Sequence, residues 1–155
     1  MSEPSIGAVV PDITATATGN RTFQLNALRG RKVVLYFYPR DATPGCTTEG
    51  QQFRDHYAAF QAAGAEVFGV SRDSLASHEK FKSKQEFPFE LISDPDETLC
   101  KQFGVIKEKN MYGRKVLGIE RSTFLIDAEG KLAKSWRKVR VKGHVEEVLA
   151  AVQAL

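Results

Sequence analysis

The stretch "KVVLYFYPRDATPGCTTEG" (residues 32–50) determines the fold expected of this chain. Its first seven residues, 32–38, form a near-continuous apolar run of β-branched and aromatic residues, which is typical of a central parallel strand buried on both faces. A helix is expected from about Thr43 to Ala63, because apolar side chains recur there at helical spacing. "EVFGVS" (66–71) predicts a second buried strand, so strand, helix and strand form a right-handed crossover.

The rest of the chain adds further strands and helices to this unit. Helices are expected at 74–85, at 94–103 and from 144 onward. Strands are expected at 89–93 and in a hairpin that pairs 121–127 with 131–139. Residues 106–120 should form a loop with some strand, and "ITATATG" and "TFQL" should form a small hairpin. This order predicts an α/β, thioredoxin-like fold, with a central mixed sheet flanked by helices and an N-terminal β-hairpin extension.

Length and composition fit one globular domain over residues 1–155. The chain is 42% hydrophobic and 26% charged, and a chain this long needs neither a disulfide nor a metal to fold. A net charge of +3 is too small to indicate nucleic-acid binding, and no apolar run is long enough for a membrane span. We expect no signal peptide, and two distant cysteines then predict a protein of the reducing cytoplasm. Three scattered histidines lack metal-ligand spacing, so we expect no metal and no cofactor.

Cys46 has an unusual position for a cysteine. With Thr43 as N-cap and Pro44 as the first helical residue, the thiol lies in the first turn of the helix. Unpaired backbone N–H groups and the positive end of the helix dipole favour the thiolate there. Gly45 beside the sulfur leaves access for a small substrate. A free cysteine is more often a small buried hydrophobe, but the coincidence of strand end, cap, proline and helix start favours a reactive thiol.

These residues resemble a known family. "PRDATPGC" fits the Pro-x-x-x-Thr-x-x-Cys signature of peroxiredoxins as Pro39, Thr43 and Cys46. The wider "YFYPRDATPGCTTE" resembles the bacterioferritin comigratory protein, or peroxiredoxin Q, subfamily. The resemblance continues through "FGVSRDSLASHEKF", "LISDPDETLCKQFGV" and "RSTFLIDAEGKL", and covers roughly residues 5 to 150. It implies a thiol-dependent peroxidase of antioxidant defence that reduces hydrogen peroxide and organic hydroperoxides.

The resemblance also implies roles for single residues. Cys46 would attack the peroxide and become a sulfenic acid, Thr43 would hold thiolate and peroxide, and Pro39 would shield the pocket from water. Arg121 would place a permanent cation near the sulfur; without the resemblance it reads as a surface charge at a strand end. Glu49 either orients Arg121 through an ion pair or complements the helix dipole, and the sequence leaves both open.

The chain departs from the subfamily in its second cysteine. The two positions where relatives carry a resolving cysteine correspond to Gln51 and Lys82. Cys100 is the only other candidate, and a semi-buried helix cysteine is the favoured interpretation over a resolving one. We therefore expect a one-cysteine cycle in which an external thiol, namely thioredoxin, glutaredoxin or glutathione, reduces Cys46. The resemblance further suggests a monomer.

Three other functions stay open at this point. Cys46 alone could serve a thiol–disulfide oxidoreductase, which would not consume peroxide. It could be the switch of a redox-sensing or chaperone-like binding module, which would be oxidised without turnover. A glutathione-peroxidase-like enzyme shares the fold and is suggested by Trp136, although a tryptophan in this hairpin is more typical of packing.

Overall fold

The computed structural model describes residues 4–155 and is built on a seven-stranded sheet of order β2-β1-β5-β4-β3-β8-β9. The strands are β1 (Thr14–Ala17), β2 (Arg21–Gln24), β3 (Lys32–Phe37), β4 (Ala65–Ser71), β5 (Glu90–Ser93), β8 (Ser122–Ile126) and β9 (Leu132–Trp136). β3, β4 and β5 are parallel, whereas β8 and β9 on one side and the β1–β2 hairpin on the other are antiparallel. The expected mixed sheet with an N-terminal hairpin is confirmed.

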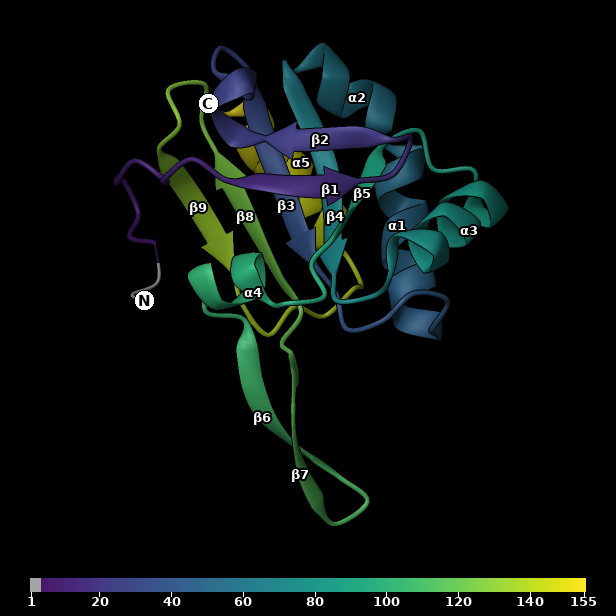
Figure 1. The fold of residues 1–155 in the computed structure, drawn as a ribbon. Coiled ribbons are helices and arrows are strands. Elements are labelled where there is room, and N and C mark those ends of the chain that lie inside the picture. Colours follow the sequence, from purple (N-terminus) through teal and green to yellow (C-terminus); the bar gives the residue numbers. More distant parts are fainter. Residues whose placement is uncertain (1–3) are drawn as a thin grey trace.

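Helices cover both faces of this sheet (Figure 1). They are α1 (Pro44–Asp55), α2 (Tyr57–Ala62), α3 (Leu75–Gln85), α4 (Thr98–Gln102), α5 (His144–Gln153) and the short 3-10 helix η1 (Leu25–Leu28). Residues of α1, α2, α3 and α5 pack in one apolar cluster, and residues of α4, η1 and the N-terminal hairpin pack in a second. None of the helices within residues 4–155 combines the length and apolar character needed to cross a membrane.

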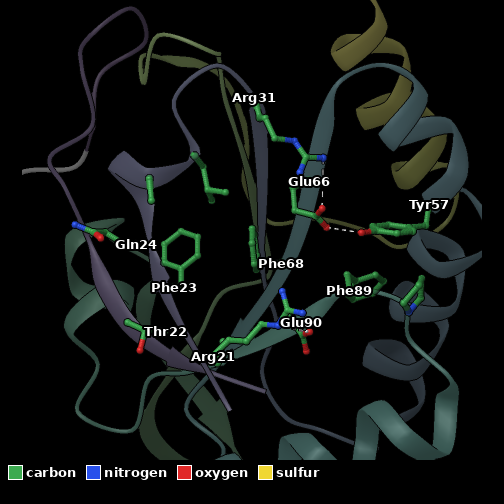
Figure 2. Close-up of a pocket in the computed structure, with 14 residues that line it drawn as sticks. Arg21, Thr22, Phe23, Gln24, Arg31, Tyr57, Glu66, Phe68, Phe89 and Glu90 are labelled. Carbon is green, nitrogen blue, oxygen red and sulfur yellow. Dashed lines mark hydrogen bonds and ion pairs between the residues drawn. The ribbon is translucent and has the colours of Figure 1, made fainter. Parts of the chain in front are cut away.

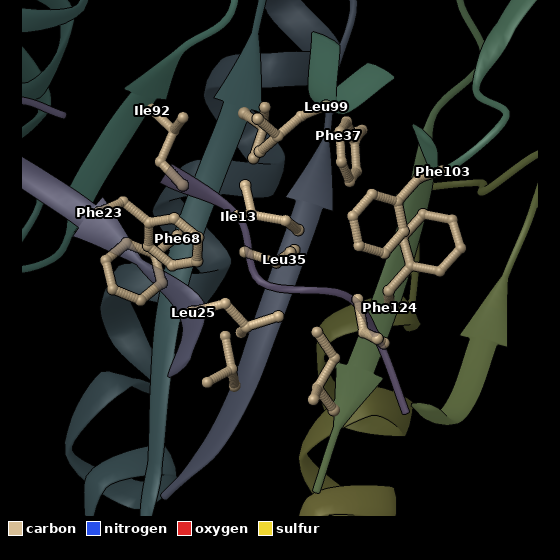
Figure 3. Packing of buried hydrophobic residues seen from close by; sticks show 14 of the residues in the cluster. Ile13, Phe23, Leu25, Leu35, Phe37, Phe68, Ile92, Leu99, Phe103 and Phe124 are labelled. Carbon is tan, nitrogen blue, oxygen red and sulfur yellow. The ribbon is translucent and has the colours of Figure 1, made fainter. Parts of the chain in front are cut away.

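The two apolar clusters lie on opposite faces of the sheet, because successive side chains of a strand point to opposite sides. In β3, Leu35 and Phe37 belong to the cluster under α4, and Val34 and Tyr36 to the cluster under α1. Figure 3 shows Leu35 and Phe37 among the side chains of the first cluster. The face on which a side chain lies therefore follows from its place in this alternation.

The helix expected over 43–63 is two helices. The chain leaves helical geometry at His56, whose φ of −102° and ψ of 4° separate α1 from α2. The ring Nδ1 of His56 lies 2.9 Å from the Gln52 carbonyl oxygen, which also accepts from the His56 backbone N–H at 3.1 Å. The side chain and the backbone of His56 thus share one acceptor, which is consistent with the break in the helix at this residue. The spacing of apolar residues does not predict such a break.

Two further expectations need correction. The helix expected to start at Asp94 begins only at Thr98, because Glu97 has a left-handed backbone with φ of 64°. Asp94 still serves the helix start, since its carboxylate accepts from the N–H groups of Leu99 at 3.1 Å and Cys100 at 2.8 Å.

The segment 106–120, expected to be mostly loop, is a regular hairpin. β6 (Ile106–Met111) and β7 (Arg114–Ile119) form a separate two-stranded sheet that extends away from the rest of the molecule (Figure 1). Tyr112 and Gly113 form the turn with φ of 54° and 79°, as a two-residue hairpin requires.

Close packing at Gly69 in β4 yields a prediction on stability. A Cβ at this position would lie 2.8 Å from both Leu91 Cδ2 and Tyr36 Cζ, so Gly69→Ala should lower the free energy of unfolding in urea by about 1–3 kcal/mol. Gly118→Ala is the matched control, because the three atoms nearest to its Cβ all belong to the flexible Lys109 side chain, the nearest at 3.3 Å. Equal losses in the two variants would contradict the packing argument.

Candidate active site

Cys46 is the third residue of α1, which begins after a short loop (residues 38–43) at the carboxyl end of β3. Pro44 is the first helical residue and Thr43 has the extended backbone of an N-cap, as the sequence predicts. The Thr43 hydroxyl does not cap α1, however; it donates to the Arg40 carbonyl oxygen at 2.9 Å. The Cys46 side chain is almost fully covered, with 1% of its surface exposed.

Arg121 reaches Cys46 across 75 residues of sequence. Its Nη2 lies 3.4 Å from Cys46 Sγ, and its Nη1 donates to Glu49 Oε1 at 2.6 Å. The sheet register explains the meeting, because Ser122 pairs with Phe37 and so puts Arg121 beside the loop that follows β3. Of the two interpretations that the sequence left open for Glu49, the structure shows the ion pair with Arg121.

Burial dominates the electrostatics of this ion pair. Glu49 is fully buried, and burial raises the pKa of its carboxyl to about 7 against the opposing effect of the Arg121 guanidinium. Burial lowers the pKa of Arg121, but the interactions of the guanidinium with Glu49 and Cys46 outweigh it, so the net direction is upward. Arg121, with 16% of its side chain exposed, thus stays a cation beside the sulfur.

Gly45 provides the space in which the guanidinium lies. A Cβ built at this position would be 3.1 Å from Arg121 Nη2. The sequence suggested that Gly45 leaves access for a substrate; the structure adds that it lets Arg121 approach the thiol. Pro39 and Thr43 are both half-buried. Both belong to the loop 38–43, so the proline and threonine of the motif lie directly before α1.

A hydrogen-bond network between this loop and α3 was not predicted from the sequence. The Asp41 carboxylate accepts from Tyr38 Oη at 2.7 Å and Ser77 Oγ at 2.8 Å, and lies 2.7 Å from His78 Nδ1. We call these four residues the Asp41 network. Asp41, Asp73 and His78 also have ligand atoms within 4.8 Å of one another, and each is engaged in hydrogen bonds to protein groups. The sequence feature that could have indicated the network is the acidic residue Asp41, which stands between Pro39 and Thr43 of the motif.

Cys100 lies far from this arrangement in the fold. It is fully buried in α4, in the apolar cluster on the opposite face of the sheet from Cys46. Burial, followed by the Asp94 carboxylate, raises the pKa of its thiol well above the ordinary value. A buried, protonated thiol behind the sheet has the properties of a packing residue.

The pocket in Figure 2 lies between the N-terminal hairpin, β4, β5 and α2, and has a volume of about 420 Å³. Three phenylalanines line it, together with two ion pairs: Phe23, Phe68, Phe89, Arg31–Glu66 at 3.5 Å and Arg21–Glu90 at 3.6 Å. None of the residues that line it belongs to the motif around Cys46. Cys46 is therefore at a different place from this hollow.

Comparison with known proteins identifies the family. The AhpC/TSA family matches residues 6–135, and Peroxiredoxin Bcp of Xanthomonas campestris is 54% identical over 143 residues, which are 92% of this chain and 89% of that protein. The chain is a peroxiredoxin of the AhpC/TSA family. Peroxiredoxin Bcp of Bacillus subtilis, at 47% identity over 96% of this chain and 94% of its own, places this peroxiredoxin in the Bcp, or peroxiredoxin Q, group.

Solved structures agree with this peroxiredoxin in fold. A mutant of Xylella fastidiosa PrxQ superposes with a TM-score of 0.93 at 45% identity, covering 99% of this chain and 98% of that one. The X. campestris bacterioferritin comigratory protein, solved as trapped intermediate and ligand complexes bearing on its alkyl peroxide reduction activity, gives 0.90 at 52% identity, covering 97% and 96%. The thioredoxin-like fold is confirmed. As a peroxiredoxin, the protein takes a peroxide as substrate and a thiol as reductant.

The raised pKa of Glu49 predicts a pH-dependent stability. The carboxyl titrates near 4.5 in the unfolded chain and near 7 in the fold, so the folded state binds the proton more readily between these values. Its contribution to stability therefore falls as pH rises from about 4.5 to about 7, and is constant outside this window. The free energy of unfolding of wild type minus that of Glu49→Gln should drop by on the order of 1–3 kcal/mol across it.

Urea unfolding at a series of pH values measures this difference. Glu129→Gln is the control, because the Glu129 side chain is 78% exposed and its replacement should leave the difference flat across the same window. A flat difference for Glu49→Gln as well would contradict the raised pKa.

Proposed function

We propose that this peroxiredoxin reduces hydrogen peroxide and organic hydroperoxides through a sulfenic acid on Cys46. One observation carries the proposal: the Cys46 sulfur lies in the first turn of α1, 3.4 Å from the guanidinium of Arg121. Helix N-terminus and guanidinium both favour a thiolate, and a thiolate is the form that attacks peroxides. The described alkyl peroxide reduction by the X. campestris relative supports organic hydroperoxides as substrates.

The chemical step moves one oxygen atom. The Cys46 thiolate attacks the terminal peroxide oxygen, the S–O bond forms, and the O–O bond breaks with its electron pair on the departing oxygen. A proton converts this oxygen to water or an alcohol, and Cys46 is left as a sulfenic acid. Arg121 stabilises the thiolate before the step and the charge on the departing oxygen during it, while Glu49 holds the guanidinium in place.

Thr43 and Pro39 complete the proposed site. Because the Thr43 hydroxyl donates its hydrogen to the Arg40 carbonyl, its lone pairs are left to accept a hydrogen bond from a peroxide. Pro39, half-buried in the same loop, shields the sulfur and the sulfenic acid from water. Binding and shielding are thus assigned to the loop 38–43, and charge stabilisation to Arg121.

The proposed cycle is reset by an external thiol. Neither subfamily position for a second cysteine carries one: Gln51 donates to Gln85 at 2.9 Å, and Lys82 pairs with Glu90 at 2.5 Å. With Cys100 on the other face of the sheet, the sulfenic acid reacts with thioredoxin, glutaredoxin or glutathione. A mixed disulfide forms with loss of water, and a second thiol then releases the Cys46 thiolate.

We further propose one domain over residues 1–155, acting as a monomer in the cytoplasm, where such thiols are kept reduced.

Two cysteine variants test the cycle. Peroxide consumption with thioredoxin, its reductase and NADPH should be lost in Cys46→Ser and largely kept in Cys100→Ser. Intact mass spectrometry after one equivalent of peroxide should show one added oxygen on wild type and on Cys100→Ser alike. An intramolecular disulfide in wild type, together with loss of turnover in Cys100→Ser, would make Cys100 the resolving residue and refute the one-cysteine cycle.

Arg121→Lys tests the charge stabilisation. A lysine ammonium keeps the charge but lacks the planar fork whose two nitrogens contact Glu49 and Cys46, so the second-order rate constant for peroxide should fall by about 10- to 100-fold. Stopped-flow oxidation of the reduced protein measures it. Arg114→Lys on the exposed hairpin strand β7 is the matched control and should react at the wild-type rate; an unchanged rate in Arg121→Lys would remove Arg121 from the mechanism.

A further inference from the structure

The Asp41 network joins the loop 38–43, which contains Thr43 and leads to Cys46, to the helix α3. Asp41 and Tyr38 belong to the loop 38–43, whereas Ser77 and His78 come from α3, so the network ties the loop to a separate helix. Asp41 is also fixed through its backbone, because its N–H donates to Asp73 Oδ2 at 2.9 Å. Hydrogen bonds to both the side chain and the backbone of Asp41 therefore fix its position in the loop.

His78 and Asp41 form a buried side-chain contact. Its side chain is fully buried, its Nδ1 lies 2.7 Å from Asp41 Oδ2, and its Nε2 lies 2.9 Å from the Ile92 carbonyl oxygen in β5. The ring therefore bridges the Asp41 carboxyl group and the backbone of β5. Removing the imidazole leaves the buried carboxyl group without one of its hydrogen-bond partners, which is costly.

The loop needs such a restraint because its backbone is strained. Ala42, between Asp41 and Thr43, has φ of 63°, in the left-handed region that a residue with a Cβ rarely adopts. Strain of this kind persists only where surrounding contacts determine the conformation. Asp41 precedes Ala42 in the chain, and the contacts of its side chain and backbone restrain the conformation of Ala42.

This restraint acts on the reacting groups. Thr43 donates to the Arg40 carbonyl, so both partners of that hydrogen bond flank Asp41 and Ala42, and a shift of Asp41 changes where the Thr43 hydroxyl points. Cys46 is 1% exposed, so an external thiol reaches its sulfur only when the loop or the first turn of α1 moves. The same restraint therefore helps the reaction with peroxide and hinders the reaction with the reductant.

We propose that His78 is a positioning residue of the peroxidase site: through Asp41 it holds the loop 38–43 in the conformation that reacts with peroxide and keeps the Cys46 sulfur covered. This inference rests on the proposed function. It predicts effects of opposite sign on the two halves of the cycle when the pair is broken, which general destabilisation of the fold does not produce.

Two His78 variants separate its two hydrogen bonds. His78→Asn places an amide near the position of Nδ1 and can still donate to Asp41, whereas His78→Gln reaches toward Ile92 and gives up Asp41. Stopped-flow kinetics would measure oxidation of the reduced protein by hydrogen peroxide, and reduction of the sulfenic acid form by glutathione. In His78→Gln we expect oxidation to be slower by about 10- to 100-fold and reduction to be faster, with His78→Asn closer to wild type in both.

Asp41→Asn and the double variant Asp41→Asn/His78→Gln test whether the two residues act as a unit. The double variant should be no slower with peroxide than the worse single variant, because either change breaks the same pair. Amide hydrogen exchange of residues 40–46 should be faster in His78→Gln than in wild type. This readout does not depend on turnover.

Val152→Ala in α5 is the control for stability, since Val152 is fully buried in the same apolar cluster as Cys46 but belongs to a different helix from the network. It should leave both half-reactions at wild-type rates. Wild-type rates for both half-reactions in His78→Gln, or losses in both that match its unfolded fraction, would overturn the inference.

Two further results would be decisive. If His78→Gln does not fold, Ser77→Ala removes a single donor to Asp41 and should give the same opposite effects at smaller size; their absence would overturn the inference. If wild type itself failed to consume peroxide, the proposed function would fall, while hydrogen exchange in the loop would still show whether His78 restrains it.

Discussion

The buried ion pair between Arg121 and Glu49 is the constraint on which the site depends. Neither charge could remain in the interior alone, because a buried ion without a partner is strongly disfavoured. Glu49 lies one helical turn after Cys46 on α1, and Arg121 lies just before β8. Pairing them therefore fixes the helix that carries the thiol against the strand that brings the cation, and it satisfies the charge requirement and the geometric requirement together.

Backbone register determines that these groups meet at all. β3 is hydrogen-bonded to β8 on one side and to β4 on the other, so its carboxyl end delivers the start of α1 to the place where Arg121 arrives. The alternation of side chains along β3 separates the two apolar clusters and, with them, the two cysteines. The separation of Cys46 beside Arg121 from Cys100 on the other face of the sheet therefore follows from this single strand.

Much of the fold was predictable because it depends on local patterns. The apolar run of β3, the proline at the start of α1 and the glycine-containing turns have local causes, and the structure confirms these elements. The break at His56 and the late start of α4 depend on single side chains and one left-handed residue, which periodicity does not register. The Asp41 network joins residues 37 positions apart, so only the folded chain reveals that His78 belongs beside the motif.

Gly45 sets a limit on how the family signature can be interpreted. The hydrogen atom that replaces its side chain is what lets the guanidinium of Arg121 lie against the thiol. A homologue could keep every residue that touches the peroxide and still lose its reactivity, if a bulkier residue at this position pushed the arginine aside. Inspection of the reacting residues alone would misjudge such a protein, because the space that Gly45 leaves for the guanidinium is as much a part of the proposed site as the charges.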